Sequence, residues 1–358
     1  MPVPEPMEHA AWMRRCLQLA CNGEGQTAPN PLVGAVLVQG GRVLAEGWHR
    51  AYGGPHAEVE CLRAFGDGPI PRDAVMYVSL EPCSHAGRTP PCANLLVARQ
   101  VPTVVVGCPD PNPKVAGRGI ALLREAGIQV ISPVLEDACR WVNRRFITAM
   151  ERQRPYIILK WARSIDGFLD RSPRGTRCVQ RISSFTTDVL VHRWRSAEAA
   201  IMVGSRTVLN DDPRLDVRHV DGPSPLRVVL DRGNVAPPDS HVFRDGGRTL
   251  LFTARERHGT DIPQVILAAE ADPLPGILEE LHKHEIRSLL VEGGGELLGH
   301  FIRLGLWDEA REIVGQPHFG QGTPAPRLPH SPVRSVPSGA DCILFYTNGT
   351  QALDAWPW

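Results

Sequence analysis

The sequence of 358 residues has little of several features that mark whole classes of protein. Its formal net charge is zero, so it lacks the basic excess of a general nucleic-acid binder. Aromatic residues make up only 6%, which leaves few stacking platforms for single-stranded nucleic acid. No apolar stretch approaches a membrane span, and residues 1–6 do not resemble a secretory signal. We therefore expect a cytoplasmic protein that binds neither nucleic acid nor membrane.

Cysteine usage also differs from that of a secreted protein. The nine cysteines are odd in number and widely spread, so we expect reduced thiols, some of them metal ligands. Hydrophobic residues make up 42% and charged residues 22%, which is ordinary globular composition. The length suits two domains of ordinary size.

Apolar periodicity predicts alternating helices and strands in both halves, which is typical of α/β domains. In the first half we expect helices at 7–21, 56–65, 91–99, 119–126 and 136–150, and strands at 32–38, 42–48, 74–80, 103–107 and 128–132. In the second half we expect helices at 184–195, 274–283 and 296–304, strands at 156–161, 200–203, 226–230, 249–253, 264–268 and 288–292, and a loop at 317–337. A polar segment that ends at Pro155 predicts domains at 1–150 and 154–358.

The most informative residues are His56, Glu58, Cys83 and Cys92. One imidazole and two thiolates form a three-ligand set for zinc that leaves a fourth position open to water. Bound zinc lowers the pKa of such a water to about 7. Because Glu58 lies two residues after His56 at the start of a predicted helix, we expect its carboxylate beside the metal without ligating it. Glu58 is thus a candidate general acid and base.

Each of these residues alone is a weak signal. A histidine at a helix start is commonly a cap, and free cysteines are commonly core residues. A structural zinc site would need a fourth ligand, for which Cys61, His85 and Cys108 are candidates, and would leave Glu58 without a role. Taken together, the order His-x-Glu followed by Pro-Cys and a second cysteine is typical of zinc deaminases.

The neighbouring residues resemble one family in particular. Base and nucleoside deaminases usually have two residues between the cysteines, whereas this chain has eight. The block Glu81–Cys92 resembles the bifunctional deaminase–reductase family of riboflavin biosynthesis, as do Asn30–Ala35, Gly47–His49 and Asp110–Gly119. This resemblance implies an N-terminal, cytidine-deaminase-like α/β/α domain.

The resemblance also implies a substrate, 2,5-diamino-6-ribosylamino-4(3H)-pyrimidinone 5′-phosphate, whose 2-amino group is replaced by water. Asn30 and His49 would line its pocket, although Asn30 between two prolines also suits a plain turn. His85 and Arg88, between the two cysteines, have two interpretations, as substrate contacts or as solvated loop residues.

The second half lacks a Gly-x-Gly-x-x-Gly fingerprint after its first strand. Glycines 293–295, at a strand-to-helix junction, suit either a phosphate-binding turn or a plain tight turn. Segments 160–167, 204–213, 215–218 and 225–231 resemble the reductase domain of the same family. The resemblance implies a C-terminal, dihydrofolate-reductase-like α/β domain.

The reaction implied for this domain is reduction of the ribosyl side chain by NADPH, which gives 5-amino-6-(5-phosphoribitylamino)uracil. The implied cofactor-binding residues are Ala162, Thr207, Asp211, Arg232, Gly294, Gly295, Glu296, Leu297, Leu298, Gly299 and His300. The implied substrate-binding residues are Lys160, Val179, Arg195, Leu215, Arg218 and Glu292. The arginines suit the substrate phosphate because a guanidinium fork matches its oxygens.

The chain departs from the family at three positions of the second half. Val179 replaces a substrate-contacting serine, Arg181 a cofactor-side tryptophan, and Arg232 a common serine. Arg181 and Arg232 are either contacts of the NADPH 2′-phosphate or surface residues. The departures leave open a zinc deaminase with a non-functional reductase domain.

Two further hypotheses come from other functional classes. One is a nucleic-acid-editing deaminase, which the zero net charge and scarce aromatics argue against. The other is a non-catalytic zinc module, which Glu58 argues against. We expect small-molecule substrates, bound zinc and NADPH, and a homo-oligomer, because related enzymes commonly assemble.

Overall fold

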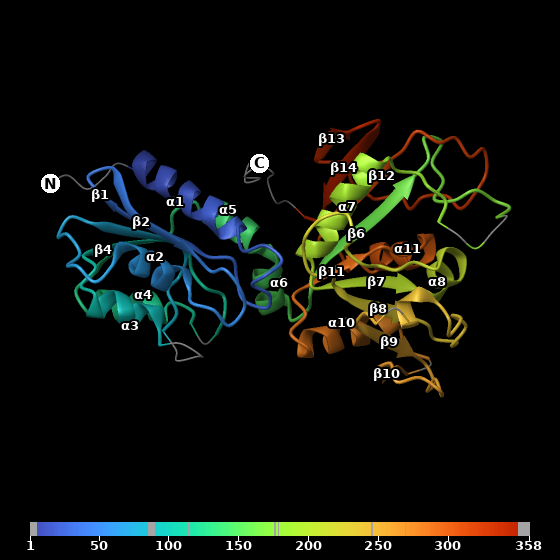
Figure 1. The fold of residues 1–358 in the computed structure, drawn as a ribbon, viewed down its shortest axis with the longest axis horizontal. Coiled ribbons are helices and arrows are strands. Elements are labelled where there is room, and N and C mark those ends of the chain that lie inside the picture. The colour runs from blue at the N-terminus through green and yellow to red at the C-terminus, as the bar shows by residue number, and fades with distance from the viewer. Residues whose placement is uncertain are drawn as a thin grey trace. The chain divides into compact units, whose positions relative to one another are not determined.

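The computed structural model describes residues 6–84, 90–113, 115–174, 177, 179–244, 246–268 and 270–349. This part of the chain divides into two compact units, the first ending at Arg152 and the second beginning at Gln153. In Figure 1 the first unit runs from blue to green and the second from green to red. Among the described helices, none has the length and apolar character needed to span a membrane.

The first unit is built on a five-stranded sheet with the order β2-β1-β3-β4-β5. Its strands are β1 (Gly34–Gln39), β2 (Arg42–Trp48), β3 (Val75–Leu80), β4 (Thr103–Cys108) and β5 (Gln129–Ile131). β1 is antiparallel to β2 and β3, whereas β3, β4 and β5 are parallel. Leu80 pairs with Cys108, so the segments that follow β3 and β4 leave the sheet side by side.

Helices cover both faces of this sheet. They are α1 (Pro6–Cys21), α2 (Ala57–Phe65), α3 (Cys92–Ala98), α4 (Arg118–Glu125), α5 (Glu136–Val142) and α6 (Arg144–Arg152). α1 and α5 lie on one face, and α2, α3 and α4 lie on the other (Figure 1). Because side chains alternate along a strand, Val36 packs under α1 while Leu37 packs under α2. The expected α/β/α architecture is confirmed.

The single helix expected at 136–150 is wrong, because α5 and α6 are separate helices that meet at Asn143. The Asn143 side chain accepts from the Leu32 N–H at 2.8 Å and donates to the Leu32 carbonyl at 2.9 Å. A side chain that pairs with distant backbone in this way offers the chain an alternative to a continuous helix.

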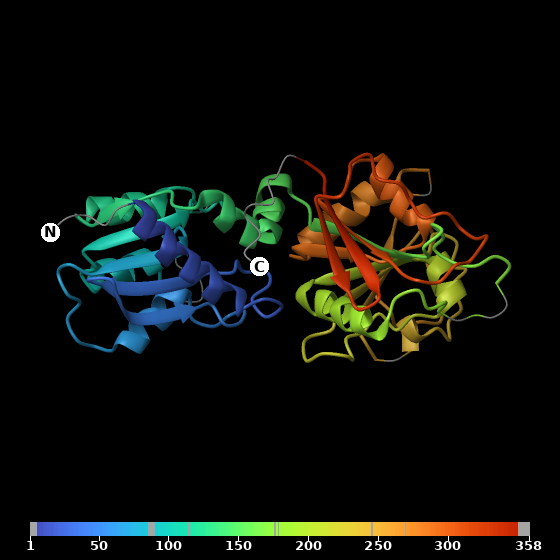
Figure 2. The same ribbon diagram turned by 90° about the horizontal axis from the view of Figure 1, so that it is seen from above.

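The second unit has a nine-stranded sheet with the order β10-β9-β8-β7-β11-β6-β12-β14-β13. Its strands are β6 (Tyr156–Arg163), β7 (Ala200–Gly204), β8 (Leu226–Leu230), β9 (Thr249–Thr253), β10 (Gln264–Ile266), β11 (Ser288–Val291), β12 (Glu309–Val314), β13 (Arg334–Ser338) and β14 (Asp341–Thr347). The strands from β10 to β12 in this order are parallel, and β13 and β14 form an antiparallel hairpin, red in Figure 2. The sequence did not predict β12 or β14, and β13 begins inside the loop expected at 317–337.

The helices of the second unit are α7 (Phe185–Ala197), α8 (Ser205–Asp211), α9 (His241–Arg244), α10 (Pro273–Lys283) and α11 (Gly295–Arg303). α10 and α11 bury Leu278 and Phe301 against one face of the sheet. α8 and α9 bury Val208 and Val242 against the other face. Because β6, β7, β8 and β11 are parallel, their carboxyl ends meet at one edge of the sheet, where open α/β sheets bind ligands.

Candidate functional site

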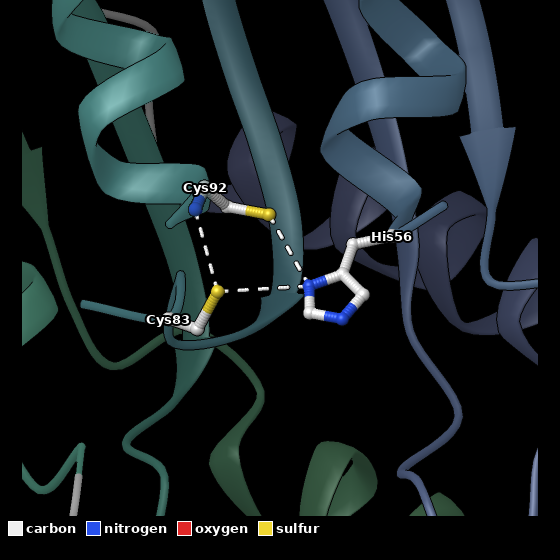
Figure 3. Close-up of side chains that lie close together, drawn as sticks. All are labelled: His56, Cys83 and Cys92. Carbon is white, nitrogen blue, oxygen red and sulfur yellow. Dashed lines mark hydrogen bonds between the residues drawn. The ribbon is translucent and has the colours of Figure 1, made fainter. Parts of the chain in front are cut away.

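Three side chains of the first unit converge on one point, as Figure 3 shows. His56 immediately precedes α2, Cys83 follows β3, and Cys92 is the first residue of α3. The His56 Nδ1 lies 3.6 Å from the Cys83 Sγ and 3.3 Å from the Cys92 Sγ. Tetrahedral zinc with standard bond lengths requires about 3.6 Å between these atoms. The three side chains therefore fit a zinc ion.

The environment favours ionisation of one of the two thiols. The Cys92 N–H donates to the Cys83 Sγ over 3.3 Å. Hydrogen bonds from Cys92 lower the pKa of Cys83, and sharing the remaining proton raises the pKa of Cys92. One thiolate is thus present at neutral pH, and a divalent cation at this point would favour the second.

Glu58 lies in the first turn of α2 and is 3% exposed. Burial raises the pKa of its carboxyl group, and the negative charge of Cys83 raises it further. A buried carboxyl with a raised pKa can accept and return a proton near neutral pH, which an exposed glutamate does poorly.

Asn30 and His49 come together beside the zinc ligands. The Asn30 Nδ2 donates to the His49 Nε2 at 3.1 Å, and the His49 Nδ1 donates to the Pro55 carbonyl at 2.9 Å. These two bonds fix the tautomer, and burial lowers the pKa of His49, so the ring stays neutral. The His49 and His56 rings stand edge to face with centroids 5.5 Å apart.

In the part of the chain that the structure describes, no fourth ligand joins His56, Cys83 and Cys92. The Cys61 thiol donates to the Ala45 carbonyl, and the Cys108 thiol donates to the Ser79 carbonyl. His85 and Arg88 lie outside the described residues. An open fourth position is what distinguishes a catalytic zinc from a structural one.

Glu81 has a structural role that the sequence analysis missed. Its buried carboxylate accepts four backbone N–H groups at 2.9–3.2 Å, from Asp110, Gly117, Gly119 and Ile120. These bonds hold the segment after β4 and the start of α4 against the turn that carries Cys83. The one signal of this role in the sequence was the position of Glu81, two residues before Cys83.

The second unit contains a cavity of about 1090 Å³, which has room for a cofactor beside a substrate. It opens among the carboxyl ends of β6, β7, β8 and β11 and the starts of α8 and α11. The expected residues that line it are Lys160, Ala162, Val179, Arg195, Thr207, Asp211, Leu215, Arg218, Arg232, Glu292, Gly294, Gly295, Glu296, Leu297 and His300.

Two of the expected cofactor contacts do not line this cavity. Leu298 is fully buried in the hydrophobic core, and its N–H donates to the Gly294 carbonyl within the first turn of α11. Gly299 follows it on the helix and is likewise absent from the cavity wall. The α11 residues Glu296, His300 and Arg303 line the cavity and recur one helical turn apart, and Leu298 lies on the opposite side of the helix.

Glu292 is the centre of a buried ion-paired cluster in the cavity wall. Arg195 donates to both of its carboxylate oxygens, at 2.8 and 2.9 Å, and the Lys160 Nζ lies 3.4 Å from Oε2. Burial alone would raise the pKa of Glu292, but the two cations outweigh it and hold that pKa at about 2. The carboxylate is therefore ionised at neutral pH.

The remaining expected contacts have local partners. The Thr207 Oγ1 accepts the Gly294 N–H at 3.1 Å, which ties α8 to the start of α11. Asp211 pairs with Arg174 at 2.8 Å, and His300 contacts Asp272 at 2.7 Å.

At the cavity rim, Arg181 pairs with Asp188 at 3.0 Å and Val179 is exposed. The cavity wall also includes His192, which the sequence analysis missed. Its spacing of one helical turn from Arg195 was the available signal.

The two units define a class of protein, a zinc-dependent deaminase joined to a reductase, and comparison with known proteins gives the family. The zinc-binding region of cytidine and deoxycytidylate deaminases matches residues 6–108, and the RibD C-terminal domain matches residues 155–333.

Relatives match over nearly the whole chain. The riboflavin biosynthesis protein RibD of Synechocystis is 37% identical over 88% of this chain and 86% of its own length. The RibD protein of Escherichia coli is 37% identical over 94% and 99%. The chain therefore belongs to the RibD family of riboflavin biosynthesis, and it is a bifunctional deaminase and reductase that uses zinc and NADPH.

Solved structures agree with this family. A diaminohydroxyphosphoribosylaminopyrimidine deaminase/5-amino-6-(5-phosphoribosylamino)uracil reductase from Thermotoga maritima has a TM-score of 0.85 and 32% identity, covering 95% of this chain and 98% of that one. The Acinetobacter baumannii RibD structure has a TM-score of 0.86 and 34% identity, covering 96% and 99%. The expected pairing of a deaminase fold with a reductase fold is confirmed.

Proposed function

We propose that residues 1–150 deaminate 2,5-diamino-6-ribosylamino-4(3H)-pyrimidinone 5′-phosphate and that residues 154–358 reduce the ribosyl group of the product. The observation that carries the first step is the three-ligand cluster with a buried glutamate beside it. The observation that supports the second is the large cavity at the carboxyl ends of the parallel strands, with a glycine-rich helix start and a charged cluster in its wall.

In the deaminase site, His56, Cys83 and Cys92 hold zinc, which when bound supplies a water of lowered pKa as the nucleophile. Glu58 takes a proton from the attacking water and delivers a proton to the departing amino group, so ammonia leaves. Asn30 holds the pyrimidine through the amide atoms that His49 does not use, while His49 fixes the direction of that amide.

In the reductase site, the nicotinamide, when bound, supplies the hydride to the imine-like carbon of the ring-opened sugar. The first turn of α11 and Thr207 hold the cofactor phosphates, because helix starts offer free N–H groups to anions. Lys160 and Arg195 offer N–H groups to the sugar and its phosphate. Glu292 uses three of their N–H groups and so fixes the direction of the rest.

We also propose that the chain acts in the cytoplasm as a homo-oligomer. The eight cysteines within the described ranges form no disulfide, in keeping with a reducing compartment. Analytical ultracentrifugation of the purified protein tests the assembly, and a single species with the mass of one chain would contradict it.

The test of the deaminase proposal is Glu58→Gln. This change keeps the shape of the side chain but removes its proton-transfer capacity, so ammonia release should fall about 10²- to 10⁴-fold while bound zinc is retained. Ammonia is measured by a coupled assay and zinc by elemental analysis.

The matched control is Glu60→Gln on the same helix, because Glu60 pairs with the exposed side chains of Arg50 and Arg63 and does not belong to the three-ligand cluster. That variant should release ammonia at the wild-type rate. Wild-type turnover by Glu58→Gln would contradict the proposed role of Glu58.

A further inference from the structure

The face of α7 that borders the reductase cavity carries a histidine with no role in the proposed function. His192 lines the cavity together with Val191 and Arg195, and it is 3% exposed. Side chains three positions apart lie on the same side of a helix, so His192 and Arg195 face the same neighbouring segment. That segment is 212–225, which connects α8 to β8.

His192 and Arg195 hold consecutive parts of this segment. The His192 Nδ1 accepts the backbone N–H of Arg218 at 3.1 Å. The Arg195 Nη1 donates to the backbone carbonyl of Asp216 at 3.2 Å. One turn of α7 therefore holds a donor and an acceptor of the 216–218 backbone.

This backbone needs such support. Leu215, just before it, has a φ of +56° in the left-handed region, which is costly for a residue with a branched side chain. The Arg218 side chain is 47% exposed and contacts only the Asp216 carboxylate among the ion pairs of the described residues. The position of its guanidinium group at the cavity thus depends on where its backbone is held.

The chemistry of His192 suits an acceptor. A neutral imidazole has one donor and one acceptor nitrogen, so the bond from Arg218 places the ring proton on Nε2. Burial lowers the pKa of His192 to about 4, helped by the positive charges of Arg195 and Arg218 and opposed by Asp216. The His219 ring packs edge to face on it at 4.4 Å. At neutral pH the acceptor nitrogen is free of a proton.

We propose that His192 is a positioning residue for the reduction step, which holds the Arg218 backbone so that the guanidinium group meets the phosphorylated end of the substrate. This inference rests on the proposed substrate contact of Arg218. It distinguishes His192 from Arg195 and Lys160, which offer their own N–H groups to the substrate.

The test uses two substitutions at one position. His192→Leu removes the acceptor and keeps most of the bulk, so the KM for the deaminated substrate should rise about 3- to 10-fold, the equivalent of one lost hydrogen bond. The Kd for NADPH and the kcat should change little. His192→Asn should restore the KM, because its Oδ1 occupies nearly the position of the imidazole Nδ1. Unchanged NADPH binding reports that the second unit of each variant is folded.

A second comparison asks whether the effect passes through Arg218. Arg218→Ala should raise the KM by itself, and adding His192→Leu to that variant should raise it no further. An unchanged KM in His192→Leu, a His192→Asn variant as impaired as His192→Leu, or full additivity with Arg218→Ala would each overturn the inference.

Failure of the proposed reductase function gives a different result, because the wild-type protein would then oxidise no NADPH with this substrate. The role of His192 can still be measured in that case. Amide hydrogen exchange of segment 216–218 should be faster in His192→Leu than in the wild type and normal in His192→Asn. Unchanged exchange in His192→Leu would overturn the inference.

Discussion

Two buried glutamates illustrate how partners decide the ionisation of a side chain. Glu58 has a raised carboxyl pKa, because burial and the negative charge of Cys83 act in the same direction. The Glu292 side chain is also largely buried, but Arg195 and Lys160 hold its pKa at about 2. The raised pKa suits Glu58 to accepting and returning a proton, whereas Glu292 serves as an anion that orients cations.

Glu292→Gln should lower the free energy of unfolding of the second unit by about 3 kcal/mol at neutral pH, because it leaves Arg195 and Lys160 without their counter-charge. The folded pKa of Glu292 lies below the ordinary value of 4.5, so its stabilisation is complete above that pH and is lost as pH falls toward 2. The difference between wild type and variant should shrink over that range. Urea unfolding at several pH values measures it.

The control for this prediction is Glu279→Gln, which alters an exposed ion pair with Lys283 on α10. It should leave stability nearly unchanged at every pH. A Glu292→Gln variant as stable as the control at neutral pH would show that the cluster does not stabilise the fold.

Single residues were predictable where the chemistry is local in sequence. His56 and Glu58 are two residues apart, and a turn and a helix start bring Cys83 and Cys92 together, so residue types and spacing sufficed. Glu81 was not predictable in this way, because its four partners are backbone N–H groups, which any residue type can supply.

At the scale of elements, the Glu81 carboxylate joins the end of β3 to the start of α4. Gly119 allows this close approach, since a Cβ there would lie 2.0 Å from the Pro82 carbonyl oxygen. The start of α4 therefore helps to fix the turn that carries Cys83. Preorganised metal ligands of this kind depend on the groups that orient them.

Glu81→Gln should destabilise the first unit by about 3 kcal/mol, because either orientation of the amide turns an N–H group toward two of the four backbone donors. It should also release zinc faster to a coloured chelator. Thermal unfolding and the chelator assay measure the two effects. Glu125→Gln, at the exposed end of α4, is the matched control; equal behaviour of the two variants would refute the role of Glu81.

Helices and strands were predictable where their apolar periodicity was clear. They were not predictable where buried charged residues took the place of apolar ones. β12 is buried yet contains Glu309, Arg311 and Glu312, so its sequence looks polar. Glu309 pairs with Arg311 at 2.7 Å, and Glu312 accepts from Arg163 and from Tyr346 on the neighbouring strands. Partners so distant in sequence cannot be identified from local patterns. The cavity could not be predicted for the same reason, because segments from Lys160 to Thr323 line it.

At the scale of the whole molecule, each unit carries the groups that we propose for one reaction. The three residues that fit a zinc ion belong to the first unit, and every residue that lines the large cavity belongs to the second. Removal of zinc with a chelator should therefore abolish ammonia release and leave NADPH oxidation with the deaminated substrate intact. Parallel assays before and after chelation, and after zinc is restored, measure this. Equal loss of both activities would contradict the separation.

The most direct measurement of the bifunctional account is a two-stage assay. The zinc-loaded protein is incubated with the diaminopyrimidinone ribosyl phosphate, first alone and then with NADPH, while ammonia and nicotinamide absorbance are followed. Ammonia should appear without NADPH, and NADPH should be consumed once it is added. Ammonia without NADPH consumption would contradict a working reductase despite Val179 and Arg181, and the absence of both signals would contradict the substrate itself.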